Sequence, residues 1–244
     1  MTARRHLHVV GAVSSDTIRD AAHRATRSML AERTAHAEVG ASLVDFAAEA
    51  TSLAMARTPP GKAIACEVGC AYCCHLKISV TSLEAIAIGA HLRRTLSSAS
   101  VSRLRRAVRE VDERTHGLST AERASARVPC PLLGADQRCV AYEVRPLRCT
   151  GANSFSKDAC KAAFDGVAGA DAPIEFYGLQ KHGADAIAVG VALALDEVRL
   201  DPRPLELVAA LRIVLDDSNI AARWQRGERV FERAVDTEAL QLSR

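Results

Sequence analysis

The feature that most constrains this chain is the placement of its eight cysteines, seven of which fall in two short segments. The first segment, CEVGCAYCC, spans residues 66–74 and holds four of them within nine positions. The second, CPLLGADQRCVAYEVRPLRC, spans residues 130–149 and holds three, while Cys160 follows on a predicted helix. Thiols scattered through a core do not crowd together in this way beside a turn-forming glycine. The fold must therefore give these clustered thiols a common use.

Most of the remaining sequence carries a helical pattern. Apolar residues recur at steps of three and four over residues 38–57, and more weakly over 17–33, which predicts one core-facing stripe on each helix. The prolines and glycine of TPPGK, residues 58–62, end this pattern just before the first cysteine segment. The sequence TSLE, residues 81–84, is a capping box that predicts the start of a helix over 82–97.

The predicted fold is mainly α. We expect a compact helical domain in which two cysteine-rich loops converge on one metal or iron–sulfur site, plus an N-terminal helical arm. Pro204 suits the first turn of its helix, where an amide hydrogen is not needed. Residues 77–80 are the main strand candidate. Further helices are predicted at 100–116, 157–166, 177–197, 204–216 and 218–234.

The chain length bounds the domain organisation. With 244 residues, 48% of them hydrophobic, the chain can bury a sizeable core and is near the upper size of one domain. We expect an N-terminal helical arm at 1–62, a cysteine-cluster domain at 63–166, and C-terminal helices at 167–244 that pack on the same body.

The eight cysteines admit three interpretations. A disulfide framework suits short secreted chains, whereas this chain is long and its N-terminal apolar run, residues 7–13, is interrupted by His8 and lacks a clear cleavage site. We therefore expect a cytoplasmic protein with reduced thiols. An ordinary core cysteine explains Cys160, so its replacement is expected to remove little metal. For the two segments, metal or iron–sulfur ligation fits best, because thiolates at this spacing wrap one cation or one cubane.

The expected site joins both segments. Two predicted helices, 82–97 and 100–116, are separated by about two residues, so an antiparallel return can bring the second segment back to the first. Adjacent side chains usually diverge, so Cys73 and Cys74 are not both expected on one ion. Four-thiolate zinc and a [4Fe-4S] cluster use the same ligand count, and both stay open. The expected ligands are Cys66, Cys70 and Cys73 or Cys74, closed by one or more of Cys130, Cys139 and Cys149.

Two further details of the first segment have simpler explanations than a catalytic or ligand role. Its first three cysteines have the spacing of radical S-adenosylmethionine enzymes, but the alternating strands and helices of that class are missing from the pattern. His75, directly after the cysteines, is more readily explained as a hydrogen-bonding or solvent-facing residue than as a ligand.

The ordered motifs over residues 66–150 resemble the YkgJ-type cysteine-cluster family, a zinc- or iron-chelating CxxCxxCC domain. The motifs CEVGCAYCC, CPLL and VAYEVRPLRC carry the resemblance. Tyr142 and Arg145 fall on the Y-x-x-R-P motif of the family, and Thr150 stands where many relatives have arginine. Because a thiolate-rich site carries net negative charge, Arg145 or Arg148 is expected to stabilise it, and Tyr142 is expected to pack beside the loop. Relatives with a similar cluster include flagellin lysine methylating enzymes. The resemblance implies that the metal ligands are Cys66, Cys70, Cys73, Cys74, Cys130, Cys139 and Cys149.

The leading hypothesis is a metal-binding protein, zinc or iron–sulfur, with a structural, redox or sensing role. A cluster-dependent modifying enzyme, such as a protein methylating enzyme, is the alternative. A basic interaction module is the third, since residues 93–127 hold nine arginines against four acidic residues, although a solvated helix face explains them too. A net charge of +3 and 4% aromatic residues argue against nucleic acid as a partner.

A membrane partner is not expected, because the most apolar stretch, residues 186–195, has about half the length of a membrane span. This stretch predicts a buried helix instead. A protein partner stays open.

Overall fold

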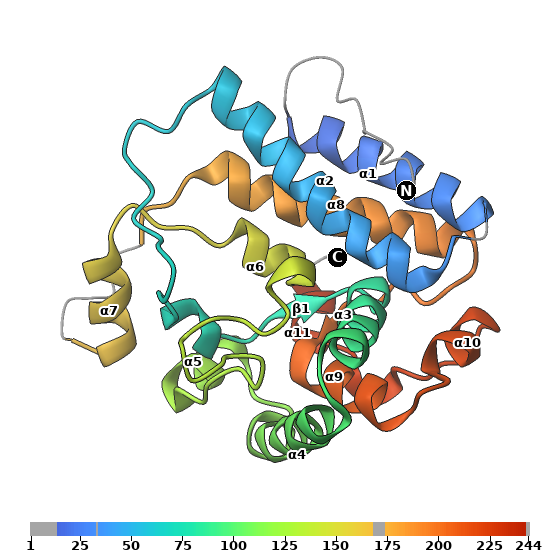
Figure 1. Cartoon of the computed structure of the whole chain (residues 1–244). Coiled ribbons are helices and arrows are strands. Elements are labelled where there is room, and N and C mark those ends of the chain that lie inside the picture. The colour runs from blue at the N-terminus through green and yellow to red at the C-terminus, as the bar shows by residue number, and fades with distance from the viewer. Residues whose placement is uncertain (1–13, 33, 168–173, 243–244) are drawn as a thin grey trace.

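The structure is a computed structural model that describes residues 14–32, 34–167 and 174–242. The described residues form eleven α-helices and one two-stranded sheet, so the prediction of a mainly α fold is confirmed (Figure 1). The apolar run considered above as an export signal, residues 7–13, lies outside the described residues.

The helices follow one another with short connections. Strands β1 (Ser79–Val80) and β2 (Leu205–Glu206) pair antiparallel, with Ser79 opposite Glu206. The helices, with η marking 3-10 helices, are α1 (Ser15–Ala31), α2 (His36–Arg57), η1 (Tyr72–His75), α3 (Ser82–Thr95), α4 (Ser98–Thr115), α5 (Thr120–Ala126), η2 (Tyr142–Val144), α6 (Leu147–Gly151), α7 (Lys157–Asp165), α8 (Gly178–Glu197), α9 (Leu207–Asp216), α10 (Ile220–Gln225), η3 (Glu232–Ala234) and α11 (Thr237–Leu242).

One hydrophobic core joins the early and late parts of the chain. Helix α1 packs along α8, and α2 contacts both α8 and α3 (Figure 1). Helix α9 lies between α3 and α4 and closes the other side of the core. Leu83, Ile88, Ile187 and Leu211 come from three of these helices and are fully buried in that core. The stretch at 186–195 lies in α8 and buries one face there, as predicted.

Two glycines allow helix backbones to touch. A Cβ atom on Gly190 of α8 would lie 2.3 Å from the carbonyl oxygen of Arg19 in α1. A Cβ atom on Gly40 of α2 would lie 2.2 Å from the carbonyl oxygen of Leu83 in α3. Glycine within a helix costs about 0.5–1 kcal/mol relative to alanine. Here the close packing of neighbouring helices requires it.

Helix α2 is also long and apolar enough, by length and composition, to cross a membrane. Core helices of soluble proteins pass the same test. Leu43, Phe46 and Ala50 of α2 are buried in the core described above.

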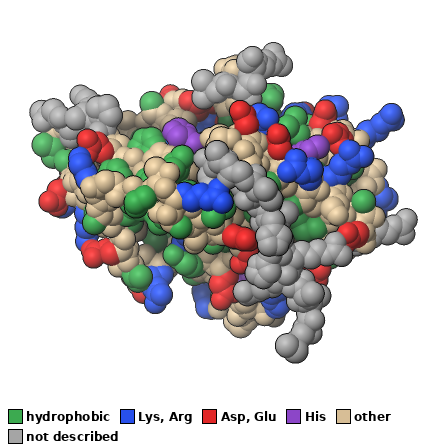
Figure 2. Space-filling view, turned by 90° about the horizontal axis from the view of Figure 1, so that it is seen from above, with side chains coloured by type: hydrophobic (Ala, Val, Ile, Leu, Met, Phe, Trp, Pro, Cys, Tyr) green, Lys and Arg blue, Asp and Glu red, His purple; other side chains and the backbone are tan. Residues whose placement is uncertain are grey.

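The surface above these helices is mixed in charge. On the face shown in Figure 2, acidic and basic side chains are interspersed. Arg19 pairs with Asp16 within α1, and Arg27 of α1 pairs with Glu197 at the end of α8. Exposed pairs of this kind contribute little to stability, about 0–1 kcal/mol each.

Three predicted elements differ in the structure. Pro204 is not in a helix, because residues 205–206 pair with β1 and Glu206 then caps α9 by accepting from the Ala209 amide. The helix predicted over 218–234 is broken, since Gly227 adopts a φ of 81° between α10 and η3.

The third difference concerns the return of the chain to the first cysteine segment. Residues 96–97 join α3 to α4, as predicted, but α4 packs against α9 rather than along α3. The return is made instead by α5, which was not predicted. Helix α6, also not predicted, carries Cys149.

Candidate metal centre

The first cysteine segment is a loop that ends in a tight helical turn. The Cys70 amide donates to the carbonyl of Glu67 at 3.0 Å, and Gly69 adopts a φ of 88° that favours glycine at this turn. Cys73 and Cys74 lie in η1, immediately before β1. The loop is thus held at its end by a regular element that belongs to the core.

The second segment crosses the first. The Cys130 amide donates to the carbonyl of Cys74 at 2.8 Å, which joins the two backbones directly. The chain then turns back on itself, with the Val140 amide donating to Leu132 at 2.8 Å and Cys139 in a bridge with Leu133. These contacts bring residues from the two cysteine segments side by side.

Glu84 links α3 to the start of α6, the helix that carries Cys149, the third cysteine of the second segment. It is the capping-box residue of α3, where its Oε2 accepts from the amide and hydroxyl of Thr81. Its other oxygen, Oε1, accepts from the Leu147 amide at 2.7 Å, at the start of α6. Glu84 is buried, and this burial raises the pKa of its carboxyl. The same side chain therefore fixes α3 and the helix that carries Cys149.

All eight cysteines are free thiols, and their environments differ. Cys66 and Cys73 are exposed, whereas the others are partly buried. Burial raises the pKa of the Cys130 thiol to about 12. Burial, followed by repulsion from the thiolates of Cys130, Cys73 and Cys139, raises the pKa of the Cys149 thiol. Thiols from both segments thus lie within electrostatic range of one another, and a bound cation would reverse this preference for the protonated form.

The side chains do not already form a coordination shell. Among the described residues, no three cysteine, histidine, aspartate or glutamate side chains stand in an arrangement that could hold a metal ion. The convergence of thiols from the two segments on one metal site therefore stays a prediction. Rotation of thiols toward a shared ion would be part of binding.

Cys73 and Cys74 are neighbours in the short turn of η1. A hydrogen bond with the Cys74 thiol is the main cause that raises the pKa of Cys73. The tight turn of η1 accounts for this, because it brings neighbouring side chains closer than an extended strand does.

Tyr142 and Arg145, the residues expected to support the ligands, lie in the second cysteine segment. The Arg145 guanidinium stands 4.1 Å from the centre of the Tyr142 ring, which is largely exposed. Arg145 Nε donates to the hydroxyl of Thr150, and attraction to this arginine counteracts the raised pKa values of Cys73 and Cys139.

His75 and Arg148 have other partners. The His75 ring nitrogen Nδ1 lies 3.2 Å from the Ala71 carbonyl, and the ring packs against Phe164 at 4.7 Å between centroids. Arg148 forms an ion pair with Asp185 at 3.4 Å.

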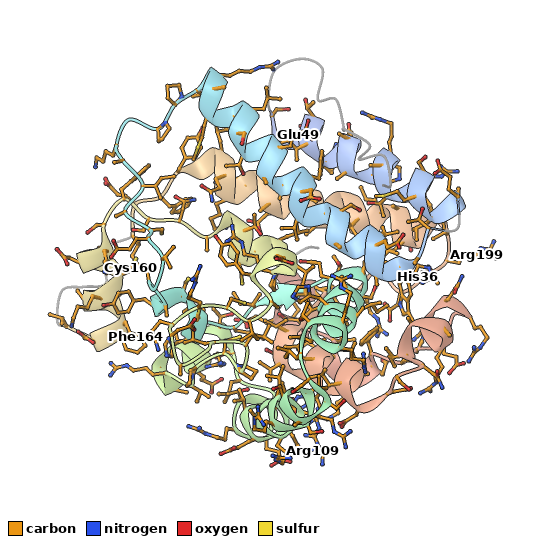
Figure 3. All side chains as sticks on the ribbon, in the orientation of Figure 1. His36, Glu49, Arg109, Cys160, Phe164 and Arg199 are labelled. Atoms are coloured by element: carbon orange, nitrogen blue, oxygen red, sulfur yellow. The ribbon has the colours of Figure 1, made fainter. Side chains whose placement is uncertain are left out.

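Arg123 is the functional candidate that the sequence did not single out. It was expected on a solvated arginine-rich face, yet its side chain is buried, with 2% of the residue exposed. Its Nη1 donates to the carbonyls of His75, at 3.1 Å, and Val128. The capping box at residues 119–122 could have predicted α5, but no sequence signal marks Arg123 as buried. Other arginines of that face, such as Arg109, reach exposed partners (Figure 3).

Cys160 faces the first segment rather than the core. Lys157, Cys160 and Phe164 follow each other at steps of three and four, which places them on one face of α7. Lys157 pairs with Glu67, and the Phe164 ring lies 5.7 Å from that of Tyr72, so both ends of this face contact the loop (Figure 3). Cys160 lies between these contacts and is not among the described residues of the hydrophobic core.

The fold and these thiols define a helical cysteine-cluster protein. Residues 65–165 match the model of the CxxCxxCC family, described as a "putative zinc- or iron-chelating domain". This stretch is similar to that family, the one its motifs resemble, and all eight cysteines fall inside it. No curated protein and no solved structure matches the chain.

The two best-formed hollows of the described structure lie away from the thiols. One, of about 480 Å³, is bordered by residues such as Lys62 and Phe176, and the other, of about 450 Å³, by residues such as His116 and Arg203. Neither lining includes a cysteine.

Proposed function

We propose that the two cysteine segments bind a zinc or iron–sulfur centre that fastens them to the helical body. The observation that carries the proposal is the backbone crossing at Cys130 and Cys74, which gathers reduced thiols from segments far apart in sequence. The match to a domain described as zinc- or iron-chelating supports it.

The residues present fit such a centre. Thiolates are soft ligands that select zinc and iron–sulfur clusters over calcium or magnesium. The buried guanidinium of Arg123 retains two nitrogens without partners, and a centre with several thiolates supplies negative charge beside it. The candidate ligands are Cys66, Cys70, Cys73, Cys74, Cys130, Cys139 and Cys149, to which the face of α7 adds Cys160.

The proposed role is structural with a sensing component. When bound, the metal or cluster supplies the bonds that join two loops with little regular structure of their own. Exposed Cys66 leaves one side of the site open to solvent, so the loops can respond to the availability of metal. Helices such as α3, α8 and α9 share a hydrophobic core that extends well beyond the two segments, so most of this core does not depend on the joint.

Replacing Cys70 with serine is expected to remove most of the bound metal, because a candidate thiolate ligand is lost. Cys160→Ser is expected to do the same, which reverses the expectation from sequence. Ala163→Ser, on the exposed side of α7, is the matched control and should bind like the wild type. Anaerobic purification with zinc, iron and sulfide analysis and visible spectroscopy measures this and separates zinc from a cluster.

Two results would count against the proposal. The proposal would fail if the wild-type protein bound no metal. It would also fail if Cys70→Ser kept all of its metal. Full retention by Cys160→Ser alone would exclude only that residue as a ligand.

Removing the metal with a chelator is expected to lower the melting temperature of the wild type while most of the far-ultraviolet helical signal stays. Metal binding to the native state adds its free energy to stability. The segments hold few helical residues, so the loss is confined to tertiary contacts. Thermal melts followed by circular dichroism, with and without chelator, test this, and superimposable melts would indicate an adventitious ion.

A further inference from the structure

Arg123 bridges the two cysteine segments from α5. One nitrogen of its guanidinium, Nη1, donates to the carbonyl of His75, directly after Cys74, and to that of Val128, two residues before Cys130. A single side chain thus holds both backbones where they cross. Its position is set by α5, which begins at the Ser119 cap.

The other edge of the guanidinium has no partner. Among the described residues, neither Nε nor Nη2 of Arg123 has a hydrogen-bond acceptor, although both atoms are buried. No ion pair of Arg123 occurs within the described part of the chain either. Burying a cation without a compensating charge is strongly unfavourable. The arrangement therefore calls for negative charge close to this edge.

Two sources of that charge interact with Arg123: the carboxyl of Glu206, which is the stronger of the two and forms no hydrogen bond or ion pair with Arg123 among the described residues, and the thiols of the proposed centre. Attraction between Arg123 and Cys130 opposes the rise in the pKa of that thiol, so the two groups interact. A divalent cation held by four thiolates keeps a net negative charge, as does a cluster with four thiolate ligands. Arg145, another arginine beside the thiols, is spread over the Tyr142 ring and is partly exposed.

We propose that Arg123 is the counter-cation of the metal centre: its buried charge offsets the negative charge of the loaded thiolates, while its Nη1 positions the two segments. The inference rests on the proposed function. It assigns Arg123 as a positioning residue, not a ligand. Metal affinity then depends on the charge at residue 123 as well as on the cysteines.

The test compares variants that differ in that charge. Chelator-stripped protein is titrated with Zn²⁺ against a competing chelator for the wild type, Arg123→Met and Arg123→Lys. We expect Arg123→Met to weaken Zn²⁺ binding by about 10- to 100-fold, the range found when residues that support metal ligands are changed. Arg123→Lys should recover part of this loss. Arg106→Met removes the same charge from an exposed site on α4 and should bind like the wild type.

The order of affinities decides the question. If Arg123 acted only through its hydrogen bonds, Arg123→Met and Arg123→Lys would bind Zn²⁺ equally weakly, and this result would overturn the proposal. An unchanged Zn²⁺ affinity in Arg123→Met would also overturn it. Should Arg123→Met not fold, Arg123→Gln replaces it as the neutral variant beside Arg123→Lys. A wild type that binds no Zn²⁺ or iron would remove the proposed function and this inference together, whereas a binding wild type with insensitive variants overturns the inference alone.

Discussion

Replacing Glu84 with alanine is expected to lower the free energy of unfolding by about 4 kcal/mol, because several buried donors lose their acceptor at once. The Thr81 amide and hydroxyl lose Oε2, and the Leu147 amide loses Oε1. Each buried donor without a partner costs about 1–3 kcal/mol. The start of α6, which carries Cys149, would also lose its attachment to α3.

The chain contains its own control for this prediction. Glu122 occupies the same place in the capping box of α5, where it accepts from the Ser119 amide and hydroxyl, but it is exposed. Glu122→Ala should cost about 1 kcal/mol or less, since water can take over these hydrogen bonds. Urea denaturation of the two variants measures the difference. Equal losses would show that Glu84 is only a helix cap and does not join α3 to α6.

Replacing Asp112 with alanine is the second change with a large expected effect, a loss of about 3 kcal/mol in the free energy of unfolding. Asp112 in α4 is fully buried, and its Oδ2 lies 2.7 Å from the guanidinium nitrogens of both Arg212 and Arg233. Removing one partner of a buried ion pair costs about 3–5 kcal/mol. The lower end applies here because both arginines are partly exposed and can be hydrated.

Glu113, the next residue of α4, provides the matched control. It is 62% exposed and lies 3.8 Å from Arg212. Glu113→Ala should therefore change the free energy of unfolding by less than about 1 kcal/mol. Chemical denaturation of Asp112→Ala, Asp112→Asn and Glu113→Ala separates the lost charge from the lost volume. A loss in Asp112→Ala no larger than in Glu113→Ala would mean that the ion pairs of Asp112 add nothing to the joint between α4 and α9.

Local signals in the sequence were sufficient for most helices and for the identity of the cysteine motifs. The apolar stripe at 38–57 and the TSLE cap at 81–84 act within a few residues, so α2 and α3 were predictable to within two residues at each end. The elements that were missed depend on distant partners. Residues 205–206 extend because they pair with β1, which displaced Pro204 from the predicted helix.

The sequence by itself determined the helical class of the protein and the kind of chemistry its cysteines can perform, because periodicity and ligand type are properties of neighbouring residues. Only the tertiary structure decided which of several residues in the same local pattern is buried and holds distant segments together. Glu84 and Glu122 stand in the same motif, yet only Glu84 is buried against a second helix. Arg123 differs from its exposed neighbours for the same reason: burial and partners from distant segments set the energy of a polar group, and no local pattern records them.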